Sequence, residues 1–221
     1  MWQRLPDTGG LKSMNKIEDA FKNKKAFIPF VTAGDPSLDV TRELILAMQE
    51  AGADLIEIGI PFSDPVAEGP VIQEADDRAL SAGVTTDKIF DMVDDIADKI
   101  HVPIVFMTYI NPIYVYGVEK FAKRAKACGA AGVIVPDVPF EEKEEIRGSF
   151  EAEGLVVISM VAPTSADRVR MIAKEAKGFL YCVSSLGVTG VRTEIGTAIG
   201  DLIQTVKEEC SIPVSYTHLT L

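Results

Sequence analysis

Short apolar runs alternate with amphipathic segments along most of the chain. The runs read as buried strands at residues 26–32, 55–60, 103–109, 131–136, 155–161 and 179–184, with a seventh strand starting at 212–214. Apolar residues at helical spacing lie between them, at residues 15–23, 38–51, 86–100, 118–128, 141–153, 166–176 and 195–210. Strands that are apolar on both faces are typical of a parallel sheet covered on both sides. The alternation therefore predicts repeated βαβ units.

The number of these units favours a barrel over a doubly wound sheet. Neither a GxGxxG loop nor a Walker loop follows any of the runs, although such loops mark the nucleotide-binding open sheets. We therefore expect a (β/α) barrel. Residues 1–13 lack this periodicity and are expected to form an N-terminal extension.

The strand at 55–60 carries a single carboxylate, Glu57, among Leu55, Ile56, Ile58 and Ile60. Either face of such a strand is apolar, so Glu57 is expected to be buried, and burial should raise its pKa towards neutrality. A carboxyl group of that kind can both give and take protons. The alternative is a structural glutamate paired to a Lys or Arg. The loop that follows, which contains Glu68, lies at the carboxyl end of the strand, where α/β proteins bind ligands.

Further polar residues follow the other predicted strands. Tyr109 and Asn111 come after the third strand, Asp137 after the fourth and the glycine-rich run at 184–190 after the sixth. Each of them taken alone could be a turn or a cap, but together they outline one site. The glycine-rich run could cradle a phosphate or act as a lid. Tyr181 could point into the barrel mouth or be a core tyrosine.

Composition excludes several classes of partner. The formal net charge is −11, which argues against nucleic acid or an anionic membrane, because both bind basic faces. The three cysteines form no CxxC pair and indicate reduced thiols in a cytoplasmic protein. The presence of only two histidines argues against a histidine-rich metal site, so we expect no metal. We see no membrane span and no signal peptide.

Six long motifs give the chain a resemblance to a known family. They are FIPFVTAGDP, IEIGIPFSDPVAEGPVIQ, TYINPIYVYG, VIVPDVPFEE, VAPTS and SSLGVTGVR, at residues 27–36, 56–73, 108–117, 133–142, 161–165 and 184–192. In order and content they resemble the alpha subunits of tryptophan synthase. The resemblance implies a TIM-barrel lyase that cleaves indole-3-glycerol phosphate into indole and glyceraldehyde 3-phosphate in L-tryptophan biosynthesis.

The resemblance also implies partners and cofactors. A beta subunit would complete an alpha2beta2 tetramer and receive the indole. Pyridoxal phosphate would belong to that beta chain, so this chain would hold no cofactor. The ligand of this chain would be a small-molecule phosphate.

The resemblance assigns roles to individual residues. Glu57 occupies the position of the proton-shuttling glutamate, and Glu68 that of the second catalytic carboxylate, which is often an aspartate and accepts the ring N–H. The extra methylene at Glu68 means that the loop must sit slightly farther back for the same contact. Substrate-binding positions fall on Phe30, Tyr109, Tyr181, Thr189 and Gly190, with Thr189 closing over Glu68 and Gly190 offering its backbone to the phosphate.

Two alternatives stay open. A different phosphate-handling barrel, such as an indole-glycerol-phosphate synthase or a pentose-phosphate epimerase, would show a catalytic lysine or metal-binding histidines at the strand ends, and these strands show neither. The second alternative is an inactive truncated subunit that only docks on the beta chain, through the loop at 61–68 and its neighbours. It arises because SYTHLTL at 215–221 replaces the glycine-rich turn, eighth strand and phosphate loop that the family would place there. The resemblance therefore implies a TIM (β/α)8 barrel that is incomplete and ends at about the seventh strand, because a full barrel needs about 250 residues. The barrel domain is then expected at 14–214 and a non-native tail at 215–221.

Overall fold

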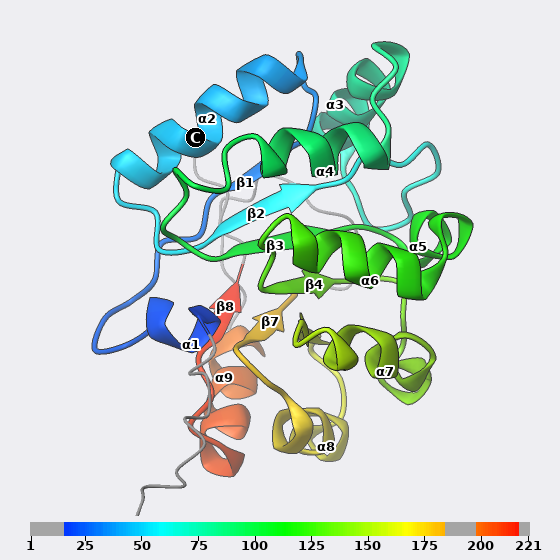
Figure 1. Ribbon diagram of the computed structural model, residues 1–221. Helices are drawn as coiled ribbons and strands as arrows, with labels where there is room; N and C mark the ends of the chain where they lie inside the picture. The colour runs from blue at the N-terminus through cyan, green and yellow to red at the C-terminus, as the bar shows by residue number, and fades with distance from the viewer. Residues whose placement is uncertain (1–15, 184–197, 217–221) are drawn as a thin grey trace, which may run out of the picture.

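The computed structural model describes residues 16–183 and 198–216, and these form parallel strands with helices around them (Figure 1). The strands are β1 (Phe30–Thr32), β2 (Ile56–Gly59), β3 (Ile104–Met107), β4 (Gly132–Ile134), β5 (Val156–Val157), β6 (Ser159–Val161), β7 (Leu180–Cys182) and β8 (Val214–Tyr216). The helices are α1 (Lys16–Ala20), α2 (Leu38–Glu50), α3 (Pro70–Ser81), α4 (Thr86–Asp94), α5 (Ile110–Tyr116), α6 (Val118–Ala127), η1 (Phe140–Glu142), α7 (Glu144–Ala152), α8 (Ala166–Glu175) and α9 (Ala198–Glu209).

The strands follow one another in space in the same order as in the chain. One sheet has the order β1-β2-β3-β4-β5 and the other β6-β7-β8, and every pair is parallel. Only Ile158 separates β5 from β6, and its N–H still donates to the carbonyl of Val133 at 2.9 Å. The predicted strand 155–161 is therefore one extended segment that leaves the first sheet and enters the second. A doubly wound sheet reverses its strand order; this consecutive order confirms the predicted barrel architecture.

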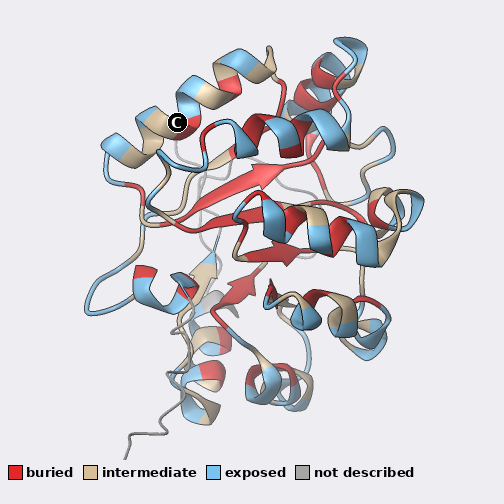
Figure 2. Cartoon of the chain, in the orientation of Figure 1, coloured by how far each residue is buried: buried red, intermediate tan, exposed pale blue. Residues whose placement is uncertain are grey.

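Alternate side chains of each strand point to an inner and to an outer face of the sheet. The outer face packs against α2, α4, α6 and α7, with Ile56, Ile58 and Phe106 in its core. The inner face holds Leu55, Val105 and further apolar side chains that pack around the two buried residues of α1. Figure 2 shows β2, β3, β4 and β7 buried and β8 only partly buried, while most of the exposed residues lie on the helices and loops. Both faces are thus covered, which explains the apolar strands of the sequence.

Two helices of the structure were not predicted. α3 follows Gly69 with Pro70 at its first position, and its buried face is only Ala75, Asp76 and Ala79, so the sequence lacks the apolar periodicity of an amphipathic helix. α5 is a short helix that begins just after β3 and ends at Gly117, whose φ is 92°. The predicted start of α2 is confirmed, because the Ser37 hydroxyl accepts the N–H of Val40.

Within the described ranges, none of the helices has the length and apolar character needed to cross a membrane.

Candidate active site

Glu57 lies in the middle of β2 and points to the inner side of the sheet. Its Cα partners on the neighbouring strands are Phe30 and Val105, and Val105 belongs to the inner cluster. The residue is 5% exposed. Burial raises its pKa to about 8, and no cation in the described part of the chain contributes to the shift. The predicted burial and pKa are confirmed, and the alternative of a structural ion pair finds no support.

Glu68 and Tyr109 meet at the carboxyl ends of β2 and β3. Glu68 is 9% exposed at the end of the loop after β2. The Tyr109 hydroxyl lies 3.3 Å from Glu68 Oε1 and accepts the N–H of Ala67 at 2.9 Å. Burial is the largest cause that raises the pKa of Tyr109, so the phenol stays protonated and donates to the carboxylate. The side-chain amide of Gln73 donates to the Glu68 carbonyl at 2.8 Å, which fixes the same loop from α3.

Asp137 ties the next loop to this edge. The backbone N–H of Ile110, at the start of α5, donates to Asp137 Oδ1 at 2.9 Å. Burial raises the pKa of Asp137, although this N–H acts in the opposite direction. The loops after β2, β3 and β4 are therefore linked by side chains that sequence alone placed at strand ends. This is the end of the strands where barrel enzymes carry their active sites.

Of the remaining residues predicted to bind substrate, the structure describes Phe30 and Tyr181. The Phe30 ring lies over Gly59. A Cβ at position 59 would lie 2.5 Å from the ring atom Cζ, so the glycine leaves the room that the ring needs. Tyr181 is buried in the inner cluster with Ile134 and Ile158. Thr189 and Gly190 lie outside the described residues.

Sequence reasoning missed Asp76, a third acid of this site. It is 6% exposed on the buried face of α3. Burial, followed by the charge of Glu68, raises its pKa to about 7. The polar run EADD at 74–77 reads as a solvent-facing surface. The available signal was the spacing of Ala75, Asp76 and Ala79, which places the three on one helical face.

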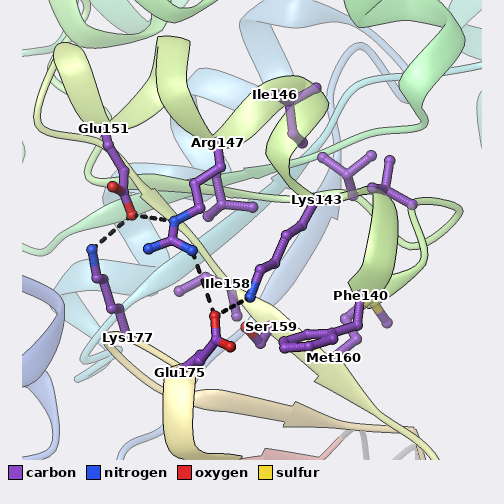
Figure 3. A pocket seen from close by; sticks show the side chains of 13 residues that line it. Phe140, Lys143, Ile146, Arg147, Glu151, Ile158, Ser159, Met160, Glu175 and Lys177 are labelled. Atoms are coloured by element: carbon purple, nitrogen blue, oxygen red, sulfur yellow. Dashed lines mark hydrogen bonds and ion pairs between the residues drawn. The ribbon is translucent and has the colours of Figure 1, made fainter. Parts of the chain in front are cut away.

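A cavity of about 60 Å³ lies elsewhere, between α7, α8 and the extended segment at 157–160 (Figure 3). None of the predicted site residues lines it. Glu151 pairs with Arg147 and Lys177, and Glu175 pairs with Lys143 and Arg147. The volume of this cavity is far below the roughly 300–1,000 Å³ of ligand pockets. Because each of its three cations is paired with one of its two carboxylates, we interpret the cavity as a packing feature.

The described residues contain no cluster of three His, Cys, Asp or Glu side chains that could hold a metal ion. The three cysteines are free. What the site offers is a buried carboxyl that holds its proton near neutral pH, a second carboxylate with a phenol donor, and an apolar wall. The fold is thus that of the (β/α)-barrel enzymes, and a buried carboxyl of this kind is suited to acid–base chemistry.

Comparison with known proteins gives the family. The sequence profile of the tryptophan synthase alpha chain matches residues 17–217. The alpha chain of Halalkalibacterium halodurans is 49% identical over 203 residues, which are 91% of this chain and 77% of that one. The alpha chain of Geobacillus kaustophilus is 49% identical over 194 residues, 87% of this chain and 72% of the relative.

Solved structures agree with the sequence comparison. A chain of Mycobacterium tuberculosis tryptophan synthase superposes with a TM-score of 0.83 at 33% identity, covering 91% of this chain and 78% of that one. A chain of the Pyrococcus furiosus tryptophan synthase complex gives 0.79 at 38% identity, covering 88% and 78%. The chain belongs to the tryptophan synthase alpha chain family, whose members are lyases of L-tryptophan biosynthesis.

Proposed function

We propose that the chain cleaves indole-3-glycerol phosphate to indole and glyceraldehyde 3-phosphate, with Glu57 and Glu68 as its two catalytic carboxylates. The observation that carries this proposal is Glu57, a buried carboxyl whose pKa of about 8 leaves it mostly protonated at neutral pH. A general acid and base works best when its pKa lies near the working pH. The identity of the substrate is inferred from the family motifs that surround Glu57 in the sequence.

In this mechanism Glu57 serves in both directions. Its carboxylic acid gives a proton to C3 of the indole ring, and the ring becomes an iminium cation. The resulting carboxylate then takes the proton of the glycerol hydroxyl. The carbon–carbon bond breaks, its electron pair returns to the ring, and neutral indole and an aldehyde result. Glu57 ends the cycle protonated, as it began.

Glu68 would stabilise the charge that grows on the ring. Its carboxylate accepts the ring N–H, which becomes more acidic as C3 is protonated, so the contact strengthens in the transition state. Tyr109 donates to the same carboxylate and holds it in place. Phe30 and Tyr181 would form the apolar walls against the indole ring, and Thr189 and Gly190 would contribute closure and phosphate binding.

We also propose a beta chain as partner. One structural neighbour comes from the tryptophan synthase alpha2beta2 complex of Pyrococcus furiosus, a complex described as mutually activating. The segments after β2 and β3, which carry the site, expose Val66 and Val115, at 74% and 81%, together with Val71 and Tyr114. Exposed apolar side chains of this kind mark protein interfaces. Pyridoxal phosphate would reside in that partner, because the site described above offers carboxylates rather than a lysine for a Schiff base.

The enzyme would act in the cytoplasm, where its cysteines, free in this structure, stay reduced. A second candidate function is docking without turnover, in which the chain binds the beta chain and activates it but cleaves no substrate. The exposed valines would serve that role equally well.

The test is indole release from indole-3-glycerol phosphate, with and without a tryptophan synthase beta chain. Two proteins are compared: the 221-residue chain and its Glu57→Gln variant. We expect turnover that Glu57→Gln lowers by about 10²–10⁴-fold, the usual contribution of a general acid or base. Binding of the beta chain by the wild type without turnover would support the docking alternative. An active Glu57→Gln variant would refute the catalytic assignment.

A further inference from the structure

Helix α3 carries the residue that holds the backbone of Glu68. The side-chain amide of Gln73, at the end of the first turn of this helix, donates to the Glu68 carbonyl at 2.8 Å. The Gln73 N–H also donates to the Gly69 carbonyl at 3.1 Å. The Glu68 carboxylate lies 3.3 Å from the hydroxyl of Tyr109, which comes from the segment after β3. A shift of α3 would therefore move this carboxylate away from Tyr109.

Apolar packing holds α3 only weakly. The helix packs towards β1, and its buried residues are Ala75, Asp76 and Ala79. An alanine side chain buries much less apolar surface than a valine or a leucine, and the stabilisation grows with the apolar area removed from water. The position of the helix should therefore depend on a further contact.

Arg78 supplies such a contact in the last turns of α3. Its Nε donates to Oδ1 of Asp35 at 2.8 Å, and its Nη2 donates to Oδ2 of Asp35 at 2.9 Å. A bidentate pair of this kind fixes the direction of the contact as well as its distance. Asp35 lies 43 residues earlier, in the turn after β1. The hydrogen bond from Arg78 lowers the pKa of Asp35, so the carboxylate is ionised at neutral pH.

The turn that carries Asp35 is itself held on two sides. The N–H of Gly34 donates at 2.9 Å to Oγ1 of Thr41, a buried residue of α2. The φ angle of Gly34 is 92°, and a Cβ at this position would lie 2.4 Å from Cγ2 of Val84, which follows the end of α3. Asp35 is thus a fixed point to which the last turns of α3 are tied.

We propose that Arg78 and Asp35 form a positioning pair for Glu68. The pair ties α3 to the turn after β1, so that the helix keeps Gln73 at the Glu68 carbonyl and the Glu68 carboxylate at Tyr109. The Arg78 side chain is 54% exposed, so the pair contributes little to global stability and acts on the placement of one helix. The consequence for catalysis rests on the function proposed above, because a group displaced by about 1 Å can slow a reaction about 10²-fold.

The first experiment measures kcat and KM of indole release for the wild type, Arg78→Gln, Arg78→Lys and Arg170→Gln. In Arg78→Gln the charge and the bidentate contact are lost, and we expect kcat to fall about tenfold with KM within about twofold, because Glu68 acts in the transition state. Arg78→Lys keeps the charge but donates from a single point, so its kcat should lie between these two. Arg170→Gln is the matched control: it removes a partly exposed arginine that joins α8 to Glu209 at the end of α9, and both constants should stay unchanged.

A double variant tests whether the pair acts through the helix. Gln73→Ala frees the Glu68 carbonyl and should itself lower kcat. If Arg78 acts by keeping Gln73 in place, adding Arg78→Gln to Gln73→Ala should lower kcat less than about threefold further. Independent contributions would multiply and give the full tenfold loss, by the same estimate.

A third experiment does not need activity. The N–H of Ala67 donates to the Tyr109 hydroxyl at 2.9 Å, and its hydrogen exchange, followed by NMR, reports how often the loop opens. We expect Arg78→Gln to speed this exchange at least about threefold. The N–H of Leu180 in β7, which donates to the Pro213 carbonyl, and the midpoint of urea unfolding should stay close to the wild type. Arg170→Gln should leave the exchange of Ala67 unchanged.

These measurements separate the two proposals. The positioning role is refuted if Arg78→Gln keeps the wild-type kcat and the wild-type exchange of Ala67. It is also refuted if Arg170→Gln has the same effects, or if the loss in Arg78→Gln appears in full on top of Gln73→Ala. If Ala67 exchanges faster in Arg78→Gln but the wild type releases no indole, the pair positions the loop and the proposed reaction fails.

Discussion

The hydroxyl of Tyr109 lies 3.3 Å from Oε1 of Glu68, a residue 41 positions earlier in the chain. The same hydroxyl accepts the N–H of Ala67 at 2.9 Å. Tyr109 sits shortly after β3, and Glu68 ends the loop after β2, so adjacent strands bring the two together. One phenol thereby holds both the side chain of the candidate second carboxylate and the backbone of the residue before it.

Replacing this phenol should disturb catalysis more than stability. In Tyr109→Phe the carboxylate loses its donor and the Ala67 N–H loses its acceptor, so we expect kcat/KM to fall about tenfold and the free energy of unfolding by about 1 kcal/mol. Indole release and urea unfolding measure the two effects. Tyr116→Phe is the matched control, because its hydroxyl meets the exposed acid Asp87, away from the site. Equal effects of the two variants would contradict the role given to Tyr109.

The raised pKa of Glu57 predicts how stability depends on pH. In the unfolded chain this carboxyl titrates near its ordinary pKa of 4.5, and in the folded chain at about 8. Between these values the folded state binds the extra proton, so its advantage is fully present below the unfolded pKa and is lost as pH rises towards the folded one. Relative to Glu57→Gln, the wild type should lose a few kcal/mol over this range, since one pKa unit corresponds to about 1.4 kcal/mol.

Urea unfolding between about pH 4.5 and 8.5 checks this prediction. Asp98→Asn, which alters an exposed acid, serves as control and should run parallel to the wild type. A constant difference between wild type and Glu57→Gln would show that the carboxyl is not buried as described.

The exposed valines beside the site predict the docking surface. Val66→Asp combined with Val115→Asp should weaken binding of a tryptophan synthase beta chain at least about tenfold, because charges would be buried at the centre of the interface. Met171→Asp changes an exposed apolar residue on α8 and should leave the affinity unchanged. Calorimetric titration with the beta chain measures both. Unaltered binding of the double variant would move the interface elsewhere.

Replacement of two glycines by alanine should have opposite effects on stability. A Cβ at Gly132 would fall on the carbonyl oxygen of Val156 in the neighbouring strand, and backbone cannot move aside as a side chain can. Gly132→Ala should therefore lower the free energy of unfolding by about 1–3 kcal/mol or more. Gly148 lies within α7 with open space around its Cβ position, so Gly148→Ala should raise stability by about 0.5–1 kcal/mol. Urea unfolding of both variants tests these two predictions.

The sequence by itself determined the architecture. Apolar strands that alternate with amphipathic helices can bury both faces of each strand only in a parallel sheet with helices outside it. The same pattern made the burial of Glu57 predictable, since both faces of its strand are apolar. Family motifs marked Glu68 and Tyr109 as candidates, and each lies in the segment that follows such a strand.

Only the tertiary structure decided which side chains meet. The passage of one extended segment from β5 to β6 depends on how neighbouring strands pair, and a run of apolar residues from Leu155 to Val161 does not reveal it. Asp76 stands in the polar run at 74–77, which shows no apolar periodicity, but the packing of α3 against β1 buries it. Contacts between residues far apart in the chain depend on which strands pair and how the helices pack, so the local periodicity of the sequence does not encode them.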